Sequence, residues 1–135
     1  MLRDTQKIDL KNIFKKFEQI KIAYLFGSYA ENKENKYSDI DIGLLLSDDF
    51  KDITKFKLDI LGNLTAKQFD NIDVIILNNS SLLMQFEAVK HNNIIYKQDC
   101  FDSCEFFSII VRKFFDFRRL LEVQRSYLKK RILDG

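Results

Sequence analysis

Three aspartates stand where their side chains could bind divalent metal ions. Asp39 and Asp41 are one residue apart at the start of the alternating stretch DIDIGLLL (residues 39–46), and Asp73 heads a second apolar run. Alternate residues of a β-strand share a face, so Asp39 and Asp41 would lie together with Cα atoms roughly 7 Å apart. Carboxylate oxygens suit Mg²⁺, and a pair of such ions can stabilise the attacking and leaving oxygens of a displacement at phosphorus. We therefore predict a site for two Mg²⁺ ions formed by Asp39, Asp41 and Asp73.

A glycine-serine pair precedes these aspartates at the end of an apolar run. Gly27 and Ser28 are followed by ten residues before Asp39. Glycine lets the backbone approach a ligand closely, and serine offers a hydroxyl and an amide at a helix start. We expect a short helix over residues 29–36, whose N-terminal dipole favours an anion. Phosphate is the expected ligand of this turn.

Each of these features has an ordinary structural interpretation when taken alone. Gly27 and Ser28 could simply form a turn, and Asp39 and Asp41 could be solvated residues on an exposed strand face. The combination is more specific, because it places a strand, a Gly-Ser turn, an alternating DxD strand and a later strand aspartate in one order. The combination favours a functional site.

The segments around these residues predict a small mixed sheet. Apolar spacings of three and four predict helices, and alternating or continuous short apolar runs predict strands. The expected fold class is α+β, or α/β in a looser scheme, with the sheet flanked by helices that we place on one side of it. The expected helices cover residues 5–19, 52–67, a segment capped by Ser80 or Ser81, and about 102–132; the expected strands cover 22–26, 39–46, 69–77 and 94–96.

Composition predicts one ordinary globular domain over residues 1–135. The chain is 46% hydrophobic and 31% charged, which excludes a disordered or fibrous protein. Its formal charge of +2 is too balanced to indicate nucleic-acid binding, so we do not expect nucleic acid as a direct partner. We find neither the apolar core of a secretory signal nor a membrane-spanning run, and we expect a cytoplasmic protein without a membrane partner.

The spacing of Gly-Ser, ten residues and Asp-x-Asp resembles the nucleotidyltransferase superfamily typified by DNA polymerase beta. Asp73 falls where that family has its third carboxylate. The resemblance covers almost the whole chain, and residues 24–46 carry most of its specificity. The length and order of elements look like the minimal nucleotidyltransferases (MNT), the MntA-type adenylyltransferase antitoxins found beside HEPN ribonuclease toxins. One departure is Glu31, which stands where many members have an arginine.

The resemblance implies a nucleotidyltransferase fold and transfer of AMP from ATP to a tyrosine hydroxyl of a partner HEPN toxin. It assigns Asp39, Asp41 and Asp73 to catalysis and to two Mg²⁺ ions, and the nucleotide phosphates to Gly27, Ser28 and Ser38. Two alternatives are a small-molecule nucleotidyltransferase of the aminoglycoside type and a non-catalytic antitoxin that acts by binding. Retention of all three carboxylates argues against the second.

The last predicted helix is rich in phenylalanine and basic residues. Between residues 112 and 131, eight basic side chains accompany two acidic ones. The simplest interpretation is one core stripe and one solvated basic face. The alternative is contact with a partner protein through Phe115, Phe117, Arg118 or Arg119, because aromatic residues and arginine are enriched at interfaces. RNA contact by the basic face is a weaker alternative.

Overall fold

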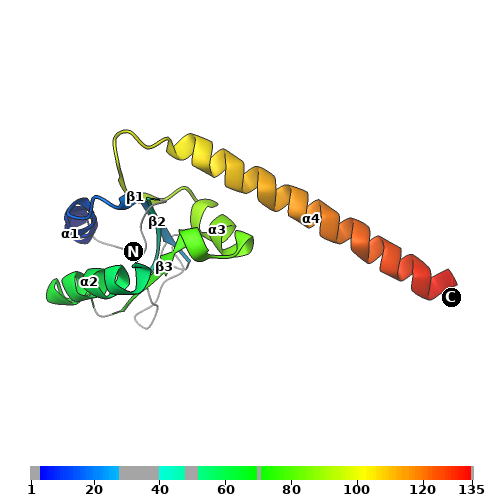
Figure 1. Ribbon diagram of the computed structural model, residues 1–135, viewed down its shortest axis with the longest axis horizontal. Helices are drawn as coiled ribbons and strands as arrows, with labels where there is room; N and C mark the ends of the chain where they lie inside the picture. Colours follow the sequence, from blue (N-terminus) through cyan, green and yellow to red (C-terminus); the bar gives the residue numbers. More distant parts are fainter. Residues whose placement is uncertain (1–3, 28–39, 48–51, 70, 135) are drawn as a thin grey trace.

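The computed structural model describes residues 4–27, 40–47, 52–69 and 71–134 (Figure 1). The expected helices and strands within these ranges are present, whereas the helix expected over residues 29–36 lies outside them. In chain order the elements are α1 (Asp4–Lys15), β1 (Ile20–Phe26), β2 (Ile40–Leu46), α2 (Ile53–Ala66), β3 (Ile72–Ile76), the 3₁₀ turn η1 (Leu77–Asn79), α3 (Leu82–Val89), β4 (Ile94–Lys97) and α4 (Ser103–Asp134).

The four strands form a mixed sheet in the order β3-β2-β1-β4. β1 pairs antiparallel with both β2 and β4, whereas β2 and β3 are parallel. The parallel pair follows from α2, because a helical crossover returns the chain to the end of the sheet where β2 began. The mixed sheet expected from the sequence is therefore confirmed, and its parallel pair contains both Asp41 and Asp73.

One face of the sheet is covered by α1 and α2. The inward residues of α1 lie three and four positions apart and those of α2 lie four apart, as amphipathic helices require. These side chains pack against alternate residues of β1 and β2. The buried members of the two helices are Leu10, Ile13, Phe14, Phe56, Ile60 and Leu64.

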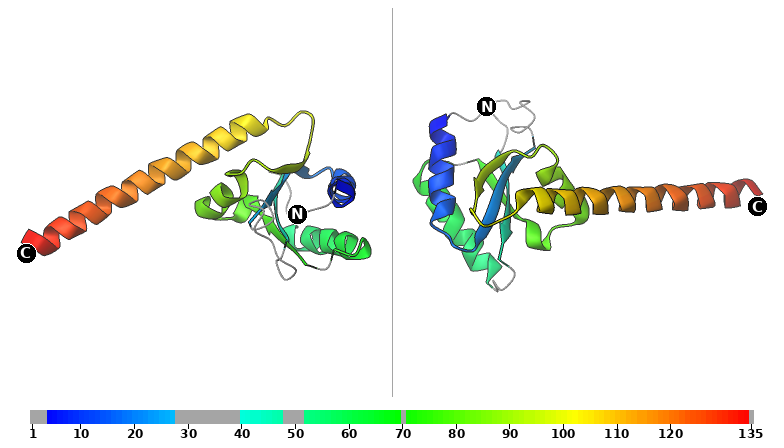
Figure 2. Two further views of the ribbon diagram at one scale, coloured as in Figure 1. Left: turned by 180° about the vertical axis from the view of Figure 1, so that it is seen from behind. Right: turned by 90° about the horizontal axis from the view of Figure 1, so that it is seen from above.

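The opposite face is covered by α3 and the first turns of α4, so the expectation of helices on one side is wrong. Figure 2 shows the sheet between α1 and α2 on one side and α3 and α4 on the other. β1 explains the difference, because Ile22 and Tyr24 are buried on the second face while Ala23 is buried on the first. A strand that is apolar on both faces needs cover on both.

The side chain of Asn78 fastens η1 to the end of β2. Its Nδ2 donates to the Leu46 carbonyl oxygen at 2.9 Å, and its Oδ1 accepts from the Leu46 amide at 2.8 Å. These two bonds imitate a strand pair and extend the parallel β2–β3 pairing beyond Ile76. The register of the two strands is thus fixed beyond the last pair of backbone partners.

α4 joins the body through its first half and then projects away from it (Figure 1). Ile110 is buried against the sheet, and the rings of Phe86 and Phe114 stack with centroids 3.9 Å apart. Phe115 meets Phe86 edge to face at 6.2 Å. The long helix expected over residues 102–132 is confirmed with small changes at its ends. Within the described ranges, no helix is long and apolar enough to cross a membrane.

Tyr24 carries a buried hydroxyl that has no hydrogen-bond partner among the described residues. Burial, with a smaller contribution from Cys104, raises the pKa of Tyr24 to about 12. An unsatisfied buried hydroxyl costs about 1–3 kcal/mol. We expect Tyr24→Phe to raise the free energy of unfolding by about 1 kcal/mol in urea titrations at neutral pH. Tyr127→Phe, at an exposed position of α4, is the control and should change nothing.

The same pair of variants has an expected pH dependence. The pKa of Tyr24 is higher in the folded protein than in the unfolded chain, so its contribution is intact below pH 10 and is lost as the pH rises from 10 to 12. The difference in free energy of unfolding between Tyr24→Phe and the wild type should therefore increase above pH 10, in favour of the variant. A constant difference across that range would contradict the burial of an ionisable hydroxyl at this position.

Candidate active site

Asp41 and Asp73 are direct partners in the parallel β2–β3 pair. Paired residues on neighbouring strands lie about 4.8 Å apart and project from the same face of the sheet. The two carboxylates therefore sit side by side, although 32 residues separate them in sequence. Placing like charges in such a pair is unfavourable unless a cation or a hydrogen-bond donor balances them. A cation or a hydrogen-bond donor is therefore expected to balance the charge of this pair.

Gly27 lies against the carboxylate of Asp41 at the end of β1. Its φ is +73°, a backbone conformation that residues with a side chain rarely adopt. A Cβ added there would overlap Asp41 Oδ2 and lie 3.2 Å from Asp41 Cγ. Gly27 is thus required twice, by its backbone angle and by the space that Asp41 occupies.

The carboxylates lie on the face of the sheet that α3 and α4 cover. Asp41 is paired with Phe26 on one side and with Asp73 on the other, and Phe26 belongs to the core cluster beneath α3 and α4. Asp41 is half-buried and Asp73 is exposed. We expected a solvent-facing position for Asp41. Its side chain is less exposed than expected, because apolar side chains occupy the rest of that face of the sheet. Asp41 and Asp73 lie at the edge of the area that α3 and α4 cover.

Three residues of the predicted site lie outside the described residues. They are Ser28, Ser38 and Asp39. Within the described residues, no group of three or more histidine, cysteine, aspartate or glutamate side chains could hold a metal ion. The structure therefore brings Gly27, Asp41 and Asp73 together, and the functional roles of all six residues stay predictions.

The donor set that is described fits Mg²⁺. Both side chains offer carboxylate oxygens, which a hard divalent cation prefers, and they come from neighbouring rigid strands. Ligands on strands are held more firmly than ligands on loops. Substrate phosphate oxygens commonly complete such a site. The pair formed by Asp41 and Asp73 is therefore suited to binding a nucleotide together with a divalent cation.

The sequence alone did not show two residues that shape this site. Asn78 holds the β2–β3 register at the far end of the pair, and Phe26 forms the wall beside Asp41. Asn78 has no recognisable motif, because a clamp on a main-chain amide and carbonyl depends on spatial proximity. For Gly27 the sequence predicted only that its backbone would let a phosphate come close. The structure adds that Gly27 lies against the carboxylate of Asp41.

A curated relative of the chain is the protein adenylyltransferase MntA of Shewanella oneidensis. The two sequences are 28% identical over 71 residues, which are 53% of this chain and 50% of the relative. The alignment thus spans about half the length of that relative.

Solved structures share the fold over most of the chain. A toxin–antitoxin crystal structure with AMP-PNP aligns with a TM-score of 0.66 at 17% identity, covering 94% of this chain and 98% of the other. The tri-AMPylated Shewanella oneidensis HEPN toxin in complex with MNT antitoxin gives a TM-score of 0.58 at 18% identity, with the same coverage of both chains. These likenesses establish a nucleotidyltransferase fold with a long C-terminal helix.

The family pattern described as polymerase beta, nucleotidyltransferase matches residues 8–100. That range contains β1, β2 and β3, and so includes Gly27, Asp41 and Asp73. The match covers more than half of the sequence, and the chain therefore belongs to the polymerase beta family of nucleotidyltransferases.

Proposed function

We propose that this chain is an antitoxin of the MntA type, which transfers AMP from ATP to a tyrosine hydroxyl of a partner HEPN ribonuclease toxin and so inactivates it. The observation that carries this proposal is the side-by-side placement of Asp41 and Asp73, with Gly27 packed against Asp41. Asp41 and Asp73 are distant in sequence, so only the folded chain can bring these two members of the predicted site together. A relative named protein adenylyltransferase and neighbours solved with AMP-PNP or with an AMPylated toxin support the choice of reaction.

The residues of the chain divide the work between nucleotide and acceptor. Asp41, with Asp39, would hold two Mg²⁺ ions, and Asp73 would complete the metal site on the acceptor side. Gly27 and Ser28 would bind the β- and γ-phosphates, and Ser38, which precedes Asp39 in the sequence, would also contact the nucleotide phosphates. When bound, the Mg²⁺ ions would lower the pKa of the acceptor hydroxyl and offset the charge of the triphosphate.

The transfer itself is an in-line displacement. The tyrosine oxygen forms a bond to the α-phosphorus of ATP, and the bond from that phosphorus to the bridging oxygen breaks, releasing pyrophosphate. The proton of the hydroxyl passes to the carboxylate of Asp73, which is exposed and so open to an incoming acceptor. The added AMP brings bulk and negative charge to the toxin, and like charge repels the RNA phosphates that the toxin must bind.

We expect Asp41→Asn and Asp73→Asn each to lower AMP transfer by at least 100-fold. Each substitution keeps the size of the side chain and removes a charge that metal binding needs. Intact-mass spectrometry after incubation with toxin, ATP and Mg²⁺ measures the transfer. Asp59→Asn, at an exposed position of α2, is the matched control. Near-normal transfer by either site variant would contradict the metal assignment.

A second prediction concerns Gly27. Gly27→Ala should displace the Asp41 carboxylate and impose a strained backbone angle, at a cost of about 1–2 kcal/mol for the angle alone. We expect weaker binding of ATP with Mg²⁺ by calorimetry, together with a lower unfolding midpoint. Gly62→Ala is the control: Gly62 lies within α2 and a Cβ there meets nothing within 4 Å, so it should raise stability by up to about 1 kcal/mol. Equal effects of the two substitutions would contradict the role given to Gly27.

A third prediction concerns the acceptor. Co-expression with the HEPN toxin should add one or more AMP groups to tyrosine-containing toxin peptides, each seen as a mass increase of one AMP residue, and Asp41→Asn should abolish this addition. A toxin that stayed unmodified yet was inhibited equally by wild type and Asp41→Asn would identify a binding antitoxin instead. Transfer to an aminoglycoside without transfer to the toxin would identify a small-molecule enzyme.

A further inference from the structure

The apolar stripe that attaches α4 to the body continues beyond the body without cover. Phe114 belongs to this stripe and stacks on Phe86. Phe117, Leu121 and Leu128 follow at spacings of three, four and seven, which keeps them on the same side of the helix. They are 48%, 37% and 59% exposed. Apolar side chains repeated along one side of a helix are the pattern of a packing surface.

A hollow of about 360 Å³ lies where α4 leaves α3. Leu83 of α3 forms one wall, and Phe117 and Leu121 are among the side chains of α4 that form the other. Arg118, Glu122 and Arg125 also line it. The hollow could accept an apolar side chain from another molecule, with two guanidinium groups and one carboxylate beside it.

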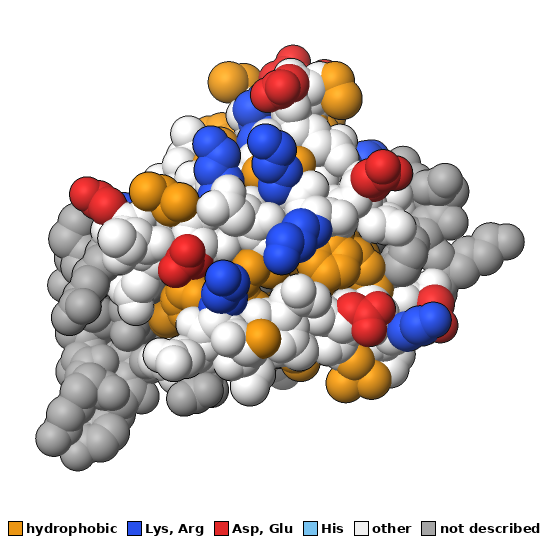
Figure 3. All heavy atoms as spheres, turned by 90° about the vertical axis from the view of Figure 1, so that its left-hand side faces the viewer, with side chains coloured by type: hydrophobic (Ala, Val, Ile, Leu, Met, Phe, Trp, Pro, Cys, Tyr) orange, Lys and Arg blue, Asp and Glu red, His pale blue; other side chains and the backbone are white. Residues whose placement is uncertain are grey.

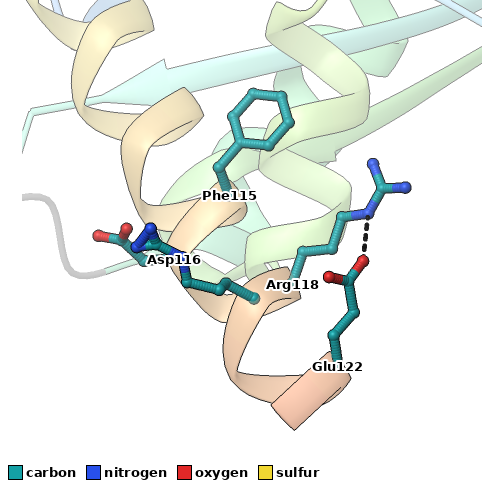
Figure 4. A pocket seen from close by; sticks show the side chains of 5 residues that line it. Phe115, Asp116, Arg118 and Glu122 are labelled. Atoms are coloured by element: carbon teal, nitrogen blue, oxygen red, sulfur yellow. Dashed lines mark ion pairs between the residues drawn. The ribbon is translucent and has the colours of Figure 1, made fainter.

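The charges along this part of α4 are strongly unbalanced. Eight basic and two acidic side chains occur between residues 112 and 131. Arg118 and Glu122 lie near each other along the helix (Figure 4), at 3.7 Å, but both are largely exposed, so the pair contributes little. The opposite end of the molecule differs, because basic and acidic side chains are interspersed there (Figure 3). α4 therefore presents a positive field around an apolar stripe.

This combination selects among the possible occupants. Two copies of α4 packed side by side would bring two helices with an excess of six positive charges each to an axial separation of about 8–10 Å, which is comparable with the Debye length of about 8 Å at physiological salt, so the two helices would repel each other. RNA would match the charge but would leave the apolar stripe uncovered. An amphipathic helix with apolar residues in the middle and Asp or Glu at its borders matches both properties.

We propose that Phe117, Leu121 and Leu128, with Leu83 and the flanking Arg118 and Arg125, form a docking surface for an acidic amphipathic helix of the partner protein. This surface is called the distal α4 surface below. The inference rests on the proposed function for the identity of that partner, and it adds where and by what chemistry the partner is held. Aromatic residues and arginine at the centre of the surface are the types that dominate binding energy at protein interfaces.

The position of the surface suits delivery of an acceptor to the active site. α3 and α4 cover the same face of the sheet from which Asp41 and Asp73 project. A partner lying along α4 therefore approaches the carboxylates from their own side of the sheet. Binding there restricts the acceptor to the neighbourhood of the reacting groups, and this raises its effective concentration.

The test measures the dissociation constant of the full chain and the HEPN toxin by calorimetry at two salt concentrations. Leu121→Ser with Leu128→Ser should weaken binding at least tenfold. Arg118→Glu with Arg125→Glu should also weaken it at least tenfold at low salt and should flatten its salt dependence. Lys55→Glu with Lys67→Glu reverses two exposed charges on and beside α2 and is the matched control. Circular dichroism should show unchanged helix content, because the substituted side chains are exposed.

The outcomes separate this inference from the proposed function. Asp41→Asn should bind the toxin as tightly as the wild type. Binding that depends on the distal α4 surface without AMP transfer would contradict the proposed function alone, whereas transfer with binding insensitive to these substitutions would overturn the docking surface alone. Sedimentation equilibrium of the chain by itself should show a monomer. A dimer that Leu121→Ser with Leu128→Ser dissociates, or an RNA oligonucleotide that competes with the toxin for Arg118 and Arg125, would also overturn the proposal.

Discussion

The parallel pairing of β2 and β3 is the constraint on which the site depends. It places Asp41 beside Asp73, and a shift of one residue would turn one of the two carboxylates to the other face of the sheet. The chain holds this register from both ends. Asn78 binds the main chain of Leu46 at one end, and at the other the Ile40 amide donates to the Asn71 carbonyl oxygen at 2.7 Å. Stability and chemistry are linked here. Two adjacent carboxylates repel each other, and the packing on both faces of the sheet holds them side by side in spite of that repulsion.

The two covered faces have different roles. The cluster beneath α1 and α2 is purely apolar and contributes the larger part of the core. The cluster beneath α3 and α4 is smaller and gives way at its rim to Asp41 and Asp73. Gly43 allows this second layer to come close, since a Cβ there would lie 3.2 Å from Leu77 and 3.3 Å from Ala88. The face that holds Asp41 and Asp73 is also the face along which α4 leaves the body.

Much of the fold could be predicted from the sequence, because short-range patterns determine it. The alternation in DIDIGLLL predicted β2 and predicted that Asp41 lies on the face of the sheet opposite to Ile40 and Ile42. The apolar spacings within residues 52–67 predicted α2. The second helical layer was missed because burial on both faces of β1 appears in sequence only as a continuous apolar run. The clamp by Asn78 and the contact between Gly27 and Asp41 join residues 32 and 14 positions apart, and no local pattern reports such contacts. The grouping of Asp41 with Asp73 was predicted from their places on two strands and also from the family resemblance, and the observed register gives it a physical basis.

We propose that Asp41 and Asp73 bind a divalent cation together with a nucleoside triphosphate. Electron paramagnetic resonance of Mn²⁺, used in place of Mg²⁺, measures this directly, because the signal of the free ion falls as the ion is bound. We predict that a mixture of protein and AMP-PNP binds Mn²⁺ more tightly than AMP-PNP alone does. Asp41→Asn and Asp73→Asn should each abolish this increase in Mn²⁺ affinity. Binding of Mn²⁺ and AMP-PNP that was unchanged in both variants would contradict the account.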